Sequence, residues 1–109
     1  MENFEQRWKD TEIMLQERFG KIPDMEGMLF LIGVNELGNL PQRKFSKEQK
    51  QDLMHIAVCT LLSQLGYYEY ELHDEGGWPH FREIKPVPVT GMQEQEQMLK
   101  ECVVMYFEK

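Results

Sequence analysis

The sequence has few of the residues from which disulfide frameworks, hydrolase sites and membrane spans are built. Its 109 residues include only two cysteines and two serines. Cys59 and Cys102 each lie in an apolar helical pattern without a Cys-x-x-Cys partner, which indicates buried free thiols and a reducing compartment. The longest apolar run, Met28 to Val34, is far shorter than the roughly 20 residues that cross a bilayer as a helix. We therefore expect a small, soluble, cytoplasmic protein with no membrane span.

Several catalytic signatures are also missing. The chain contains no Gly-x-Ser-x-Gly, His-Glu-x-x-His or Gly-x-Gly-x-x-Gly motif and no Gly-x-x-x-x-Gly-Lys loop. The only serines, Ser46 and Ser63, fit a helix cap and a position within a helix. These absences exclude serine hydrolase chemistry and favour a protein that is not an enzyme.

Positive charge is scarce. Lysine and arginine number 12 against 19 aspartates and glutamates, so the net charge is −7 and a phosphate backbone is repelled. The aromatic residues lie on apolar stripes and do not alternate with basic residues, so we expect no nucleic-acid partner. The acidic segment 1–5 has neither the basic nor the apolar region of a secretory signal, and secretion is not expected.

Helical periodicity covers most of the chain. Apolar residues recur at near-helical spacing in four segments, 3–19, 25–37, 46–65 and 91–107. Before the last segment the period changes to two around a turn signal at 74–77, which predicts a β-hairpin over about 67–85. The predicted fold is mainly α: a compact bundle of about four helices with a β-hairpin inserted between helices 3 and 4, in a single domain of residues 1–109. For residues 28–34 and for residues 103–107 a strand is the alternative.

Capping residues mark the predicted helix boundaries. Asp24 and Thr90 are suited to accept the first backbone N–H groups of the second and fourth helices. Ser46 is followed three residues later by Gln49, which predicts a capping box at the third helix. Gly20 is the residue type that commonly ends a helix in a left-handed conformation.

The hairpin has an expected register. A turn of two residues (75–76) or of four (74–77) places the two strands in the same antiparallel register. The expected cross-strand pairs are Tyr70 with Phe81, Glu69 with Arg82, and Glu71 with His80. The first pair belongs to the apolar face of a half-buried strand, and the other two bring complementary groups together on its polar face.

Two places are candidate binding elements. At the hairpin turn, adjacent glycines permit a close approach of the backbone, Trp78 is a typical anchor for a partner, and His80 lies beside it. At the start of the third helix, a basic cluster would suit a phosphate or an acidic segment. This cluster consists of Arg43, Lys44, Lys47 and Lys50. A purely structural turn and a solvated basic patch are the alternative interpretations.

The histidines support a different kind of site. The candidate ligands are His73, His80, Glu69, Glu71 and His55. If these groups converge, they predict a divalent metal site in a metal-binding protein or a small metal-dependent enzyme. If these side chains point away from one another into solvent, those of the hairpin form the polar face of a strand. His55 is then a histidine at the edge of the core. No cofactor is expected in the leading interpretation.

That leading interpretation is a non-catalytic dimeric module that binds a protein partner or a small ligand. Binding is assigned to the hairpin turn and the start of the third helix. The segments 25–37 and 53–65 are apolar nearly all round, which is more than a small four-helix domain easily encloses. We therefore expect one of these two helices to lie in a symmetric homodimer interface.

The oligomeric state is the first testable prediction. Analytical ultracentrifugation at micromolar concentration should give a species heavier than the 13.0 kDa chain, because pairing covers the excess apolar surface. A single 13.0 kDa species would contradict the prediction.

Overall fold

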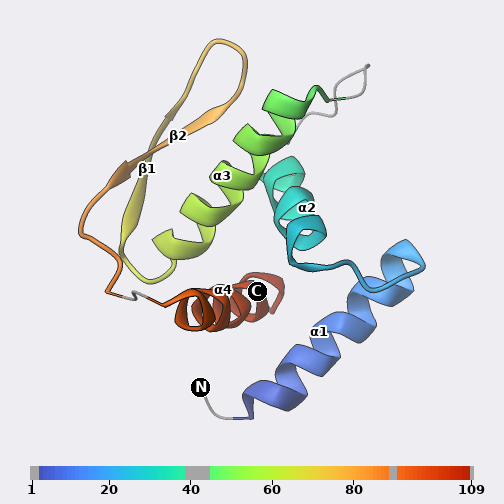
Figure 1. Cartoon of the computed structure of the whole chain (residues 1–109). Coiled ribbons are helices and arrows are strands. Elements are labelled where there is room, and N and C mark those ends of the chain that lie inside the picture. Colours follow the sequence, from blue (N-terminus) through green and yellow to red (C-terminus); the bar gives the residue numbers. More distant parts are fainter. Residues whose placement is uncertain (1–2, 39–44, 89–90, 109) are drawn as a thin grey trace.

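The computed structural model of the protein describes residues 3–38, 45–88 and 91–108 (Figure 1). Within these residues the chain forms α1 (Phe4–Phe19), α2 (Met25–Leu37), α3 (Lys47–Ser63), β1 (Tyr68–His73), β2 (Pro79–Glu83) and α4 (Met92–Phe107). The two strands form an antiparallel hairpin between α3 and α4, so the predicted mainly α fold is confirmed. The hairpin lies along α3, and α1 lies beside α4 (Figure 1). No helix in the described ranges is long and apolar enough to span a bilayer.

The predicted caps form where the structure describes them. The Asp24 side chain accepts the backbone N–H of Gly27 at 2.8 Å at the start of α2. Ser46 and Gln49 form the reciprocal hydrogen bonds of a capping box at α3. The predicted cap Thr90 lies outside the described residues. Local hydrogen bonds to side chains thus set the beginning of α2 and of α3.

The last helix settles the alternative left open for residues 103–107. These residues are helical, because α4 continues without interruption to Phe107. A strand at this position is therefore wrong, and so is a strand over residues 28–34, which lie within α2. The third helix ends at Ser63, two residues before Leu65, the last residue of its predicted apolar body.

The core lies where the four helices meet. Its buried members are Leu15, Met28, Leu29, Ile32, Ala57, Leu61, Cys102 and Val103. Both cysteines are free and buried as predicted, with Cys59 2% and Cys102 0% exposed. Burial raises the pKa of both thiols, that of Cys102 to about 11. Both thiols are therefore neutral near pH 7 and pack as small apolar side chains.

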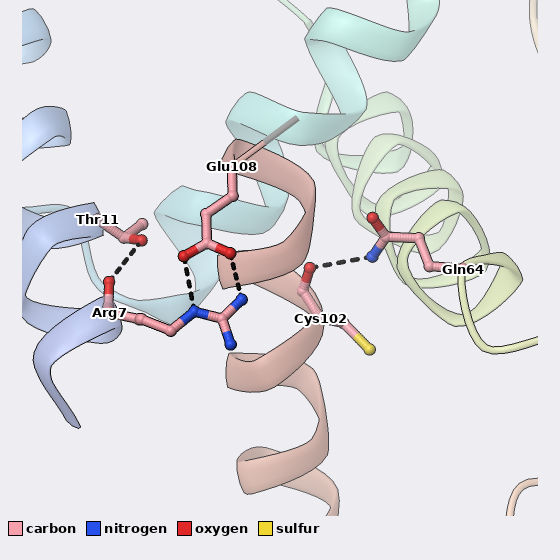
Figure 2. Close-up of polar contacts among 5 residues, drawn as sticks. All are labelled: Arg7, Thr11, Gln64, Cys102 and Glu108. Atoms are coloured by element: carbon pink, nitrogen blue, oxygen red, sulfur yellow. Dashed lines mark hydrogen bonds and ion pairs between the residues drawn. The ribbon is translucent and has the colours of Figure 1, made fainter. Parts of the chain in front are cut away.

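Polar contacts tie the C-terminal half of α4 to its neighbours (Figure 2). Arg7 on α1 donates to both carboxylate oxygens of Glu108, and its Nε lies 2.7 Å from Oε2. The backbone carbonyl of Arg7 accepts the hydroxyl of Thr11 at 3.0 Å. On the other side of α4, the side-chain amide of Gln64 donates to the carbonyl of Cys102 at 3.0 Å (Figure 2). The bonds from Arg7 to Glu108 and from Gln64 to Cys102 hold α4 between α1 and the end of α3.

The helices α2 and α3 approach each other closely at one glycine. A Cβ atom placed on Gly33 would lie 2.8 Å from the carbonyl carbon of Leu53 and closer still to its oxygen. Real Cβ atoms do not come this close to backbone atoms, and the backbone of α3 cannot give way as a side chain does. Only glycine at position 33 therefore permits this helix spacing.

The strands pair in the predicted register at the open end of the hairpin only. The predicted partners of Tyr70 and Glu69 are confirmed, but the third predicted pair is wrong, because His80 lies opposite Leu72 and not opposite Glu71. A bulge between Tyr70 and Leu72 shifts the register by one residue. The strand is also less covered than predicted, since Tyr70 is 49% and Leu72 51% exposed.

The length of the turn explains the bulge. The N–H of Asp74 donates to the carbonyl of Trp78 at 2.9 Å, and the N–H of Gly77 donates to the carbonyl of Asp74 at 3.0 Å. Gly77 has a φ of 85°, the left-handed conformation that closes a three-residue loop. A loop of three residues displaces the strands by one position relative to a loop of two or four. The bulge then restores the predicted register for the remaining pairs.

The close contact at Gly33 predicts a large effect of a single methyl group. We expect Gly33→Ala to lower the free energy of unfolding by about 3 kcal/mol, although alanine otherwise favours a helix by up to about 1 kcal/mol. Gly91→Ala is the control, because a Cβ atom there meets nothing within 4 Å. We expect the control to cost less than about 1 kcal/mol. Urea unfolding curves measure both values, and equal losses would contradict the packing constraint.

Candidate functional site

A pocket of about 510 Å³ lies between α3 and the hairpin. The lining residues from α3 are Gln49, Asp52, His55, Ile56 and Cys59. Those from the hairpin are Asp74, Trp78, Pro79, His80 and Phe81. Trp78 and His80, two of the predicted binding residues, therefore line the same pocket as residues of α3. The predicted basic cluster lies at the start of this helix.

The wall formed by α3 carries a contact between a histidine and a cysteine. The Nε2 atom of His55 lies 3.6 Å from Sγ of Cys59, one turn further along the helix. His55 is exposed, whereas Cys59 is buried. Burial raises the pKa of the Cys59 thiol, so the thiol stays protonated beside the imidazole. Burial of Cys59 therefore disfavours the thiolate that a nucleophile would need.

The wall formed by the hairpin is organised by Asp74. Its Oδ1 accepts the backbone N–H groups of Gly76 at 2.9 Å and of Trp78 at 3.0 Å. Its Oδ2 lies 2.9 Å from Nε2 of His80. The bond to His80 is the largest cause that lowers the pKa of the Asp74 carboxyl, followed by the N–H of Trp78. One ionised carboxylate thus places both Trp78 and His80 at the pocket.

The sequence places Asp74 among the carboxylates around His73 and His80, but its role in ordering the loop was not predicted. The signal was present in the sequence, because an aspartate two residues before a glycine is typical of a turn in which the side chain accepts backbone N–H groups. The composition of the turn reveals its local role. It does not reveal that the turn faces α3.

The predicted metal ligands occupy three different places. Nδ1 of His73 lies 2.5 Å from the hydroxyl of Tyr70. The carboxylates of Glu69 and Glu71 lie 2.8 Å and 3.9 Å from guanidinium nitrogens of Arg82. The two remaining candidates, His55 and His80, line the pocket.

These positions do not build a metal centre. Across residues 3–38, 45–88 and 91–108, no three histidine, cysteine, aspartate or glutamate side chains are grouped as a metal ion requires. Within the pocket, Nε2 of His80 is already engaged by Asp74.

Of the predicted basic cluster, the structure describes Lys47 and Lys50, both exposed on the first turns of α3. Lys47 is the first residue of this helix. Arg43 and Lys44 lie outside the described residues. Gln49, from the same first turn as Lys47, lines the pocket, so the start of α3 does reach it.

No protein-family model, curated protein or solved structure matches the chain. The pocket itself is therefore the guide to function. Its walls combine apolar surface from Ile56, Trp78 and Phe81 with the carboxylates of Asp52 and Asp74. A pocket of this size and mixed lining is typical of a ligand site.

The network around Asp74 predicts a pH-dependent hairpin. Because folding lowers the pKa of this carboxyl, its contribution is complete above the ordinary value of about 3.9 and is lost as the pH falls through the lowered value. The indole N–H resonance of Trp78 should report this step in NMR spectra. Asp74→Asn should keep the loop but lose the step, and Asp74→Ala should disturb Trp78 at every pH.

Asp52→Asn is the matched control, because it removes the other pocket carboxylate and leaves the Asp74 network in place. It should retain the acid step of Trp78. An unchanged step in Asp74→Asn would contradict the assignment to Asp74.

Proposed function

We propose that this protein is a non-catalytic, dimeric binding module whose ligand or protein partner enters the pocket between α3 and the hairpin. The observation that carries the proposal is the meeting of two separate candidate elements. Trp78 and His80 from the hairpin face Asp52 and His55 from α3 across a volume of about 510 Å³. Ligand pockets in proteins usually have volumes of about 300–1,000 Å³.

The charges of the lining favour a cationic ligand. Among the described residues that line the pocket, Asp52 and Asp74 are acidic and none is a lysine or an arginine. Asp74 is engaged within the hairpin, so the exposed Asp52 supplies the carboxylate for a ligand. The half-buried indole of Trp78 offers a face for a cation. The ligand class is an amine or guanidinium with an apolar body, free or as a side chain of a partner.

The chemistry of the pocket supports binding more than catalysis. A cysteine nucleophile requires a thiolate, and burial disfavours the thiolate of Cys59. The imidazole of His80 is held by Asp74, and none of the described residues that line the pocket is a serine for it to activate. The two histidines therefore serve as hydrogen-bonding walls in this proposal.

A divalent metal ion remains the alternative ligand, because His55 and His80 line the same pocket. Binding would require His80 to leave Asp74 and to turn toward α3. Native mass spectrometry before and after a chelator separates the two ideas. A chelator-sensitive mass excess of one metal per chain would favour the metal.

The homodimer is the second part of the proposal. On α2 the side chains of Phe30, Leu31 and Val34 stay half-buried, although this helix is apolar nearly all round. A second copy would cover this remaining apolar surface. The dimer and the pocket are independent claims, because none of these three residues lines the pocket.

Benzylamine and benzoate test the preference for a cation, since they share a ring and carry opposite charges. We expect benzylamine to shift the indole N–H resonance of Trp78 with a Kd in the millimolar range, as for other small fragments. Benzoate should cause no saturable shift. Asp52→Asn should weaken benzylamine binding about 5-fold, because an exposed ion pair contributes up to about 1 kcal/mol.

Asp10→Asn on α1 serves as the control, because it removes one negative charge outside the pocket. It should leave benzylamine binding unchanged. The proposed ligand class is wrong if benzoate binds as well as benzylamine, or if Asp10→Asn weakens binding as much as Asp52→Asn.

A further inference from the structure

A second cavity, an apolar groove of about 590 Å³, lies among α1, α2 and α4. We call it the α1–α2–α4 groove. Its apolar lining consists of Phe19, Leu31, Val34 and Phe107. It shares no lining residue with the pocket at the hairpin. Phe19 is 50% exposed, so the groove presents a large aromatic side chain to water.

The polar edge of the groove is ordered by Tyr106. Its hydroxyl donates to Oε2 of Glu36 at 2.6 Å and accepts from Nδ2 of Asn35 at 2.5 Å. Burial, together with the bond to Glu36, raises the pKa of Tyr106 to about 12, so the hydroxyl remains a donor near neutral pH. Glu36 is thereby held at the groove as an acceptor.

The charges around the groove are balanced. Among its described lining residues, Arg18 is the basic one and Glu36 the acidic one. In a two-fold symmetric interface, a contact from one residue to another is made twice, once in each direction. A surface with one cation and one anion beside an apolar centre is complementary to its own copy.

We propose that the α1–α2–α4 groove is the surface through which two copies of this chain pair, with Arg18 of each copy facing Glu36 of the partner subunit. This inference rests on the proposed homodimer and names its surface. The apolar residues Phe19, Leu31 and Val34 form the centre of the interface. The two ion pairs set its register. The α3–hairpin pocket stays open in each copy.

Charge reversal tests this surface. Arg18→Glu gives each chain two acidic groups at the groove, and Glu36→Lys gives each chain two basic groups. We expect each variant alone to raise the dimer dissociation constant at least about 30-fold, because two attractions become two repulsions. An equimolar mixture should restore a species of twice the 13.0 kDa protomer mass, since each opposite pair is regained. Analytical ultracentrifugation measures all three samples.

Two control variants keep the test specific. Lys9→Glu lies on the same helix, is exposed outside the groove and changes the charge by the same amount, so it should leave the dimer intact. Arg18→Lys should also leave it intact. Glu36→Lys loses the hydrogen bond from Tyr106, and circular dichroism shows whether this variant still folds. If it does not fold, Arg18→Glu still tests the surface, because Arg18 is exposed.

The outcomes separate the groove from the dimer itself. A wild-type protein of 13.0 kDa at micromolar concentration overturns both. A dimer that survives Arg18→Glu, or that Lys9→Glu weakens equally, overturns the groove and leaves the dimer standing. If each folded single variant loses the dimer and the mixture of the two regains it, the result supports the groove as the pairing surface.

Discussion

The contact between α2 and α3 at Gly33 is the constraint on which both cavities depend. The backbone of α2 lies against the carbonyl of Leu53 with no space for a Cβ atom. In turn, α3 contacts α2, α4 and both strands. Its placement therefore determines where the hairpin lies and how far α4 stands from α2. A displacement of α2 would open the core around Ile32 and change the walls of the α1–α2–α4 groove.

The two walls of the hairpin pocket are held by different kinds of interaction. The α3 wall is positioned by apolar packing, since Ile56 and Cys59 are buried residues of the helix. The hairpin wall is positioned by one carboxylate, because Asp74 bonds both the loop backbone and His80. Apolar packing tolerates a change of pH, whereas the carboxylate network does not. The pocket thus has one wall, on α3, that is held by apolar packing, and one wall, on the hairpin, that depends on the ionised carboxylate of Asp74.

Interactions that the sequence reveals well are short-ranged. Within four positions of one another lie the residues that form each end of α2, with its cap at Asp24, and those of the capping box at Ser46. The hairpin shows where this reasoning stops. The cross-strand partners of Tyr70 and Glu69 follow from the predicted register. The three-residue loop and the compensating bulge, however, place His80 opposite Leu72 and not opposite Glu71. A difference of one residue in the loop is invisible in composition.

By itself, the sequence determined the four helices, the hairpin, the burial of both cysteines and the missing catalytic motifs. Four of the five candidate metal ligands lie within residues 69–80, yet His73 turned to Tyr70, and Glu69 and Glu71 turned to Arg82. Only the tertiary structure placed His55 and His80 at one pocket and left a groove among α1, α2 and α4. The reason is physical: periodicity and caps record local contacts, whereas the distance between residues tens of positions apart is set by how the helices pack.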